Sequence, residues 1–196
     1  MRLMIIFVVL FLPCVSWAEN FKSLPNEPRY VKWVDAYTYK IPVGKKPMWQ
    51  YDLRWQGDGK PAMFIAESPQ YYYPSAVINA NHFIDNKAPS GDRDFRFFAK
   101  GAIESIAKNY GYANELLPKI NYSKKGQLSG YEVVVEGKVD GANRDVIIYF
   151  AAAPDRTVFS LVAHTLPGKA LHLKNMFDRT AINVEFPAGT LKGFDE

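Results

Sequence analysis

The sequence of 196 residues carries a formal net charge of +4, and 22% of its residues are charged. Basic residues never run beyond pairs such as Lys45-Lys46 and Lys124-Lys125, so a mixed solvated surface is expected, and binding to nucleic acid or to an anionic membrane surface is disfavoured. Cys14 is the single cysteine, which excludes a thiol nucleophile, a CxxC redox pair and a cysteine zinc site from the rest of the chain.

Residues 1–18 have the pattern of a cleaved signal peptide. Arg2 precedes an unbroken apolar run over residues 4–12, and Ser16 and Ala18 place small residues three and one positions before a cleavage point. The apolar run is too short for a membrane-spanning helix, which needs about 20 residues. We therefore expect cleavage after Ala18, export to the periplasm or the exterior, and no membrane span after cleavage.

The surroundings of Cys14 disfavour the alternative of a lipid anchor. A bacterial lipobox has a small residue directly before the cysteine, and Pro13 occupies that position here.

An exported chain without further cysteines depends on its apolar core for stability. We expect residues 19–36 to form a lead-in segment and residues 37–196 to fold as one domain, a length that suffices for such a core.

The first half of this domain reads as four strands. Trp49, Tyr51 and Leu53 alternate with polar residues, which is the pattern of a strand with one buried face. Proline or glycine residues lie between the segments and indicate turns. The predicted strands cover residues 37–42, 49–55, 62–67 and 75–84, and a polar loop over residues 85–91 follows.

The strongest helix prediction covers residues 92–110. Its apolar residues recur at a spacing of three to four, which gives a stripe that faces a core. They are Phe95, Phe98, Ala102, Ile103, Ile106, Ala107 and Tyr110. Asp92 or Asp94 is expected to cap the start of the helix, and Gly111 is expected just after its end. A short strand or turn is expected near residues 116–122.

Residues 129–164 read as three adjacent antiparallel strands. The first alternates apolar and polar residues, and the second is apolar on both faces, as in a central strand. Gly137 interrupts the apolar row of the first strand, where a bulge or a close helix approach is expected. The predicted strands cover residues 131–139, 146–153 and 157–163, with turns at Asp140-Gly141 and at residues 154–156.

A second helix is expected over residues 169–179, with Leu173, Met176 and Phe177 on one face. Residues 182–186 alternate again and are expected to form a short final strand or an extended tail. The order of elements predicts an α+β fold: N-terminal strands, a central helix, a three-stranded meander and a C-terminal helix. We expect an antiparallel sheet with the helices packed on its faces, and the sequence leaves open whether both helices share one face.

The arrangement resembles the superfamily of PsbP, DcrB and the Mog-type Ran-binding proteins over residues 37–186. The segments that carry the likeness are YTYKIP at 37–42, SAVINANHF at 75–83, LSGYEVVVEG at 128–137, DGANRDVIIYF at 140–150 and TVFSLVA at 157–163. Residues 179–186 depart from the short Ser-Phe finish that is usual in the family. The family shares no catalytic residues, so the resemblance implies a binding or scaffolding domain, as in photosystem assembly, Ran binding, envelope proteins and secretion accessory proteins.

Three consecutive tyrosines, Tyr71, Tyr72 and Tyr73, are the most unusual loop feature. Three adjacent rings cannot all be buried at a turn, so at least one of them is expected to be exposed. With Trp49 and Trp55 nearby in the sequence, they form the candidate binding site for a sugar, a peptidoglycan fragment or a partner protein. The alternative, which the sequence favours, is that these rings close the open edge of the core.

His82 and Asp85 lie three positions apart and are the candidate metal ligands. A metal site needs several imidazoles or carboxylates that converge, and this spacing alone does not bring them together. We interpret both as ordinary residues of a strand and a loop, and we expect no metal and no cofactor.

The other titratable residues do not point to an enzyme. His164 and His172 are accompanied by neither a G-x-S-x-G serine nor a cysteine, so nucleophilic catalysis lacks its nucleophile. Glu132 and Glu136 are expected about 13 Å apart along one strand, which exceeds the separation of a glycosidase pair. The sequence therefore predicts no catalytic residues.

Two functions remain as hypotheses. The first is a non-enzymatic periplasmic domain that binds another protein, either as an accessory of an envelope or secretion machine or as an immunity protein against an exported toxin. The second is a periplasmic protein that binds a small ligand, such as a lipid, a glycan or a metal, between sheet and helix. An exposed aromatic patch favours the first, and a cavity of about 300 Å³ or more with convergent polar groups favours the second.

Overall fold

The computed structural model describes residues 31–36, 38–44, 49–54 and 63–186. Eleven elements follow one another along these residues. They are β1 (Val31–Asp35), β2 (Lys40–Gly44), β3 (Gln50–Arg54), β4 (Met63–Glu67), β5 (Ala76–Lys87), α1 (Asp92–Asn109), β6 (Asn121–Lys125), β7 (Leu128–Val139), β8 (Ala142–Ala152), β9 (Thr157–Thr165) and α2 (Ala170–Ile182). The predicted signal peptide, Trp55 and the connection between the predicted strands 49–55 and 62–67 lie outside the described residues.

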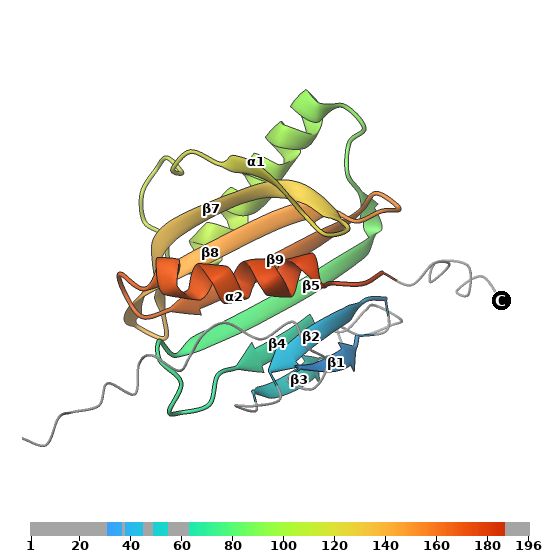
Figure 1. Ribbon diagram of the computed structural model, residues 1–196. Helices are drawn as coiled ribbons and strands as arrows, with labels where there is room; N and C mark the ends of the chain where they lie inside the picture. Colours follow the sequence, from blue (N-terminus) through green and yellow to red (C-terminus); the bar gives the residue numbers. More distant parts are fainter. Residues whose placement is uncertain (1–30, 37, 45–48, 55–62, 187–196) are drawn as a thin grey trace, which may run out of the picture.

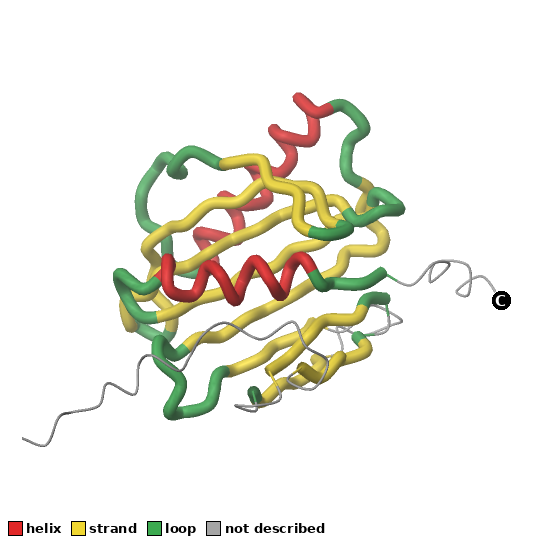
Figure 2. The backbone as a smooth tube through the Cα atoms, viewed as in Figure 1, coloured by secondary structure: helices red, strands yellow, loops and turns green. Residues whose placement is uncertain are grey.

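Seven of the strands form one antiparallel sheet in the order β3-β4-β5-β9-β8-β7-β6, and β1 pairs with β2 in a separate two-stranded sheet. The two helices lie on opposite faces of the large sheet (Figures 1 and 2). The prediction of an α+β fold with an antiparallel sheet and helices on its faces is confirmed, and the question of which face each helix covers is answered.

Successive side chains of the central strands point to opposite faces of the sheet, and apolar residues on both sides form a core on each face. Ile147 and Tyr149 of β8 point toward α2, where they pack in one buried cluster with Phe177. Val146 and Ile148 point the other way and pack with α1. The strand β8 is buried on both faces because it has a helix above it and another below it.

The meander is formed as predicted by β7, β8 and β9. Asp140 and Gly141 have φ angles of 51° and 77°, so the hairpin between β7 and β8 is a two-residue turn with both central residues in the left-handed region. Gly137 lies where the end of α1 meets β7, and a Cβ atom there would lie 2.2 Å from the carbonyl oxygen of Tyr110. That oxygen accepts a hydrogen bond of 2.7 Å from the N–H of Lys138. The predicted close helix approach is therefore confirmed.

Several element boundaries differ from the sequence prediction. The strand β1 falls within residues 19–36, which were expected to be a lead-in segment, and its short run gives no periodic signal. The strand β2 continues through Pro42 to Gly44: Pro42 pairs with Trp33 in the middle of the ladder, and because the sheet has only two strands, both of them are edge strands, where proline is tolerated. The strand β5 continues to Lys87 through an irregular register, so the expected polar loop is shorter.

The helix boundaries and β6 also differ. Gly91 occupies the N-cap of α1, so Asp92 and Asp94 lie in the first turn, where they interact with the helix dipole instead of capping the helix. The short strand β6 begins at Asn121, later than residues 116–122 suggested. The helix α2 extends to Ile182, and the expected final strand reduces to a single bridge between Lys40 and Glu185.

A cluster of four charges ties α2 to the edge of the sheet. Lys125 and Lys174 both lie 3.1 Å from carboxylate oxygens of Glu132, and both lie 2.5 Å from a carboxylate oxygen of Asp178. Lys125 and Glu132 have side-chain exposures of only 7% and 12%. Because two cations alternate with two anions, each buried charge has an opposite charge beside it.

Candidate functional site

Four connections of the chain meet at one end of the large sheet. The register places Ala76, the start of β5, beside Thr165 at the end of β9, and Thr165 beside Asp145 of β8. The connections at this end are therefore the β4–β5 loop, the end of α1, the β7–β8 hairpin and the β9–α2 loop (Figure 1, left). Loops at one end of a rigid sheet are a common location for binding residues.

The β4–β5 connection, residues 68–75, carries the three tyrosines, and we call it the tyrosine loop. Tyr71 is 68% exposed and Tyr73 is 50% exposed. Tyr72 is half-buried and packs edge-on against the ring of Trp49, with centroids 5.3 Å apart. Trp49 itself is buried at 3% exposure. Two of the five predicted aromatic residues thus face solvent, while Trp49 and Tyr72 hold the loop from below.

The base of the tyrosine loop is closed by hydrogen bonds. The N–H of Ser68 donates to the carbonyl of Ala76, and the hydroxyl of Ser68 accepts from the N–H of Ala76, both at 2.9 Å. Within the loop, the N–H of Tyr72 donates to the carbonyl of Pro69 at 2.9 Å. These bonds and the contact between Trp49 and Tyr72 fix the backbone of the loop that carries the two exposed tyrosines.

The tyrosine loop also touches the start of α2. The ammonium group of Lys169 lies 5.5 Å from the centre of the Tyr73 ring, within the range of a cation–π interaction. Lys169 follows Pro167 and Gly168, which line a neighbouring pocket. The β9–α2 loop therefore contacts the tyrosine loop on one side and lines the pocket on the other.

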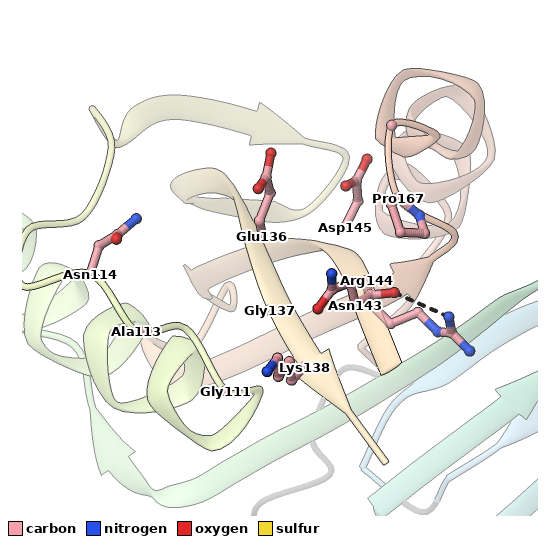
Figure 3. A pocket seen from close by; sticks show the side chains of 11 residues that line it. Gly111, Ala113, Asn114, Glu136, Gly137, Lys138, Asn143, Arg144, Asp145 and Pro167 are labelled. Carbon is pink, nitrogen blue, oxygen red and sulfur yellow. Dashed lines mark hydrogen bonds between the residues drawn. The ribbon is translucent and has the colours of Figure 1, made fainter. Parts of the chain in front are cut away.

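The pocket has a volume of about 330 Å³ and is open to solvent (Figure 3). Its lining comes from four segments, three of which supply polar side chains beside the backbone at glycines. The lining residues are Gly111, Ala113, Asn114, Glu136, Gly137, Lys138, Asn143, Arg144, Asp145, Pro167 and Gly168. Two of these segments are the arms of the β7–β8 hairpin, but residues 111–114 and residues 167–168 are distant from it in the sequence, so no local pattern in the sequence indicates this pocket.

Asp145 connects the pocket to α2. Its side chain is largely buried, and one carboxylate oxygen accepts a hydrogen bond of 2.8 Å from the N–H of Ala170 in the first turn of the helix. Glu136 lies directly opposite Asp145 on β7 and is exposed. Figure 3 shows both carboxylates on the same side of the hairpin, with Asp145 nearer to Pro167, while Arg144 is turned away and donates to the carbonyl of Asn143.

The candidate metal ligands do not come together. Nε2 of His82 lies 2.6 Å from the hydroxyl oxygen of Thr157, and Nδ1 lies 2.8 Å from that of Thr38, so both ring nitrogens have protein partners. Asp85 is exposed near the end of β5. Burial lowers the pKa of His82 to about 4, so the ring is neutral at pH 7. Within the residues that the structure describes, no three His, Cys, Asp or Glu side chains gather closely enough to hold a metal ion.

The remaining titratable candidates have separate surroundings. His164 packs against the ring of Tyr110, with centroids 5.9 Å apart, and burial lowers its pKa. His172 lies exposed on α2. Glu132 belongs to the charge cluster under α2, whereas Glu136 faces the pocket. None of the described helices is long and apolar enough to cross a membrane.

No family model matches the sequence, and no curated protein matches it. Among solved structures, the fold is similar to CyanoP, the cyanobacterial PsbP of Synechocystis sp. PCC 6803, with a TM-score of 0.51 and 10% identity over 83% of this chain and 96% of that chain. LpqN, involved in cell envelope biogenesis of Mycobacterium tuberculosis, gives a TM-score of 0.42 and 17% identity over 83% of this chain and 88% of that chain. A protein of Bacteroides thetaiotaomicron VPI-5482 gives a TM-score of 0.48 and 9% identity over 78% of this chain.

This chain spans 46% of the length of the Bacteroides protein. At these identities a likeness concerns the fold alone, and the two TM-scores below 0.5 support no functional conclusion. The CyanoP comparison shows that the chain has a PsbP-like fold. Because one fold serves many functions, the function has to be inferred from the site.

Proposed function

We propose that this chain is a non-enzymatic periplasmic domain of the PsbP, DcrB and Mog-type superfamily that binds another protein through its tyrosine loop. The partner is a component of an envelope or secretion machine, or an exported toxin that the chain neutralises. The periplasmic location rests on the signal-peptide pattern of residues 1–18. The superfamily assignment rests on the five sequence segments that resemble it and on the PsbP-like fold.

The observation that carries the proposal is that two exposed tyrosines stand on an anchored loop. Tyrosine is enriched in protein interfaces because its ring buries a large area while its hydroxyl group still forms hydrogen bonds. The loop of Tyr71 and Tyr73 is held by Trp49 and by hydrogen bonds at its base, so little conformational entropy is lost on binding. Lys169 adds a positive charge at the edge of the same surface.

A quantitative pull-down tests the proposal. The tagged chain is exported, cross-linked in envelope extract and recovered, and its partners are compared by mass spectrometry with those of a Tyr71→Ser/Tyr73→Ser variant. We expect one protein or complex to be lost from the variant. Ile182→Ser is the matched control, because Ile182 is a 49% exposed apolar residue at the other end of α2. Equal recovery of all partners by both variants would contradict the proposal.

The pocket beside the tyrosine loop favours a second candidate function, the binding of a small polar ligand. Its volume of about 330 Å³ lies at the lower end of the range of ligand pockets. Its charged and amide groups suit a glycan better than a lipid, because they can form hydrogen bonds with hydroxyl groups. Asn114, Glu136 and Asn143 are the side chains that would form them.

Calorimetric titration with a disaccharide of N-acetylglucosamine and N-acetylmuramic acid tests this second candidate. Ala113 lines the pocket and is exposed, so Ala113→Trp should fill the space without disturbing the core. Saturable binding by the unmodified chain that the Ala113→Trp variant lacks would support a glycan site. Absence of binding by the unmodified chain would remove this sugar from consideration.

A further inference from the structure

A groove of about 580 Å³ lies along the first turns of α1, at the end of the sheet away from the tyrosine loop. α1 follows the far end of β5, whereas the tyrosine loop precedes the near end of that strand. The residues that line the groove are Asp92, Arg93, Arg96, Phe97, Lys100 and Tyr131. One lining residue is acidic and three are basic, so the groove has a net positive charge.

The cations of this groove are available to a partner. Arg93 and Arg96 form no ion pair with another residue within the described part of the chain. Lys100 lies 3.7 Å from Glu104 on the exposed surface of the helix, and such an exposed pair contributes little to stability. The guanidinium group of Arg93 lies 5.8 Å from the centre of the Phe97 ring, which holds the aromatic ring beside the charge.

Aromatic rings form the rest of the surface. Phe97 is 65% exposed on a helix whose buried stripe consists of other residues, so packing among the described residues does not explain its position. Tyr131 forms the floor, and its ring lies 5.6 Å from that of Tyr122 on the edge strand β6. Tyr122 is 62% exposed. The groove thus presents an aromatic floor and rim beside guanidinium groups.

We propose that this groove binds an acidic peptide segment of another protein, with carboxylates at Arg93 and Arg96 and an aromatic or aliphatic side chain on Phe97 and Tyr131. Arginine pairs with carboxylates through two parallel hydrogen bonds, and it is enriched with aromatic residues in interfaces. The hollow shape favours a peptide over an anionic membrane, because Tyr131 is only 9% exposed and a flat bilayer surface would reach it poorly. This site does not depend on the tyrosine loop, and a chain with both would contact two segments at once.

Fluorescence anisotropy with defined peptides tests the groove. The probe is a labelled peptide of about eight residues with alternating glutamate and phenylalanine, which is longer than the groove, so that its ends do not limit contact. Its control has glutamine in place of each glutamate. We expect the acidic probe to bind at least about ten-fold more tightly than the control. Its affinity should fall as the salt concentration rises from about 0.05 M to about 0.5 M.

Variants of exposed residues assign the binding to the groove. Arg93→Glu/Arg96→Glu should lower the affinity for the acidic probe at least about ten-fold. Phe97→Ser should lower this affinity at every salt concentration. Lys119→Glu, an exposed lysine in the loop before β6, is the matched control and should change binding less than about two-fold. Circular dichroism melts of all variants check that each one folds.

Three results would overturn the proposal. The first is equal affinity for the acidic and the glutamine peptides, which would show that the groove does not recognise the negative charge of the peptide. The second is unchanged binding by the Arg93→Glu/Arg96→Glu variant in its folded form. The third is binding to phosphatidylglycerol vesicles, lost in that variant, without binding to the acidic peptide, which would assign the surface to a membrane.

Discussion

Nε2 of His82 lies 2.6 Å from the hydroxyl oxygen of Thr157, and this contact determines where the ring carries its proton. The Thr157 hydroxyl donates to a carboxylate oxygen of Asp155 at 2.5 Å, so it accepts from His82. Nε2 therefore carries the proton, and Nδ1 accepts from the hydroxyl of Thr38. The chain of hydrogen bonds links β9, β5 and the residues before β2 through a neutral imidazole.

The neutral state of His82 predicts that stability falls with acid. Burial lowers the pKa of His82 from 6.5 to about 4. Between these two pH values the unfolded chain binds more protons than the folded chain, so the free energy of unfolding decreases as pH falls from 6.5 to 4. The full decrease is about 3 kcal/mol. Urea unfolding at several pH values measures it, and His82→Gln should flatten the curve in this window.

His164 provides the control for this titration. Burial also lowers its pKa, and the positive charge of Arg144 acts in the same direction. His164→Gln should therefore remove a separate part of the pH dependence and leave that of His82 intact. If His82→Gln has the same pH dependence as the unmodified chain, the assignment of a neutral, hydrogen-bonded His82 is wrong.

Gly137 is predicted to tolerate no side chain. A Cβ atom at this position would lie 2.2 Å from the carbonyl oxygen of Tyr110, and the end of α1 would have to move away from β7. We expect Gly137→Ala to lower the free energy of unfolding by about 2 kcal/mol or more. Gly101 is the matched position, because a Cβ atom there meets nothing within 4 Å. Gly101→Ala should stabilise α1 by about 0.5–1 kcal/mol, measured by the same denaturant titration.

The charge cluster under α2 is predicted to be sensitive to the loss of one member. Lys125→Met leaves the buried carboxylate of Glu132 with one cation fewer and should cost about 3 kcal/mol. Removing both charges in Lys125→Met/Glu132→Gln should recover part of that loss. Lys100→Met, which removes an exposed pair, should cost less than about 0.5 kcal/mol. A cost for Lys125→Met as small as that for Lys100→Met would refute the buried cluster.

The three tyrosines are predicted to differ in their effect on stability. Tyr71→Ser and Tyr73→Ser change exposed rings and should alter the free energy of unfolding by less than about 0.5 kcal/mol each. Tyr72→Ala removes the ring that packs on Trp49 and should cost about 2 kcal/mol. Thermal melts of the three variants test this order. Equal costs at all three positions would show that the loop is anchored in another way.

The meander could be predicted because its signals are local. Asp140 and Gly141 both adopt positive φ angles, and a two-residue turn at these positions fixes the register of the hairpin. The strand β1 could not be predicted, since five residues paired only with β2 bury too little to show a pattern. The helix α2 runs past Arg179 because Ala181 is buried against the core, a contact that depends on the tertiary fold.

The candidate site could be predicted only in part. The run of tyrosines indicated an exposed aromatic loop, but the support of Tyr72 by Trp49 depends on how β3 and β4 pair. The polar pocket required Gly111, Glu136 and Gly168 to meet, and no local pattern encodes such a meeting. Helical spacing left Phe97 outside the predicted apolar stripe of α1, which agrees with its exposure, but it placed Phe98 inside that stripe, and Phe98 is 40% exposed.

Site-specific photo-cross-linking in living cells tests the central claim most directly. Benzoylphenylalanine replaces Tyr71 or Tyr73 in one set of strains and Ile182 in the control strain, and the cross-linked products are identified by mass spectrometry. We predict that positions 71 and 73 both cross-link to the same envelope protein or exported toxin and that position 182 does not. If neither tyrosine position gives a protein adduct while the chain is folded and exported, the tyrosine loop is not a protein-binding surface.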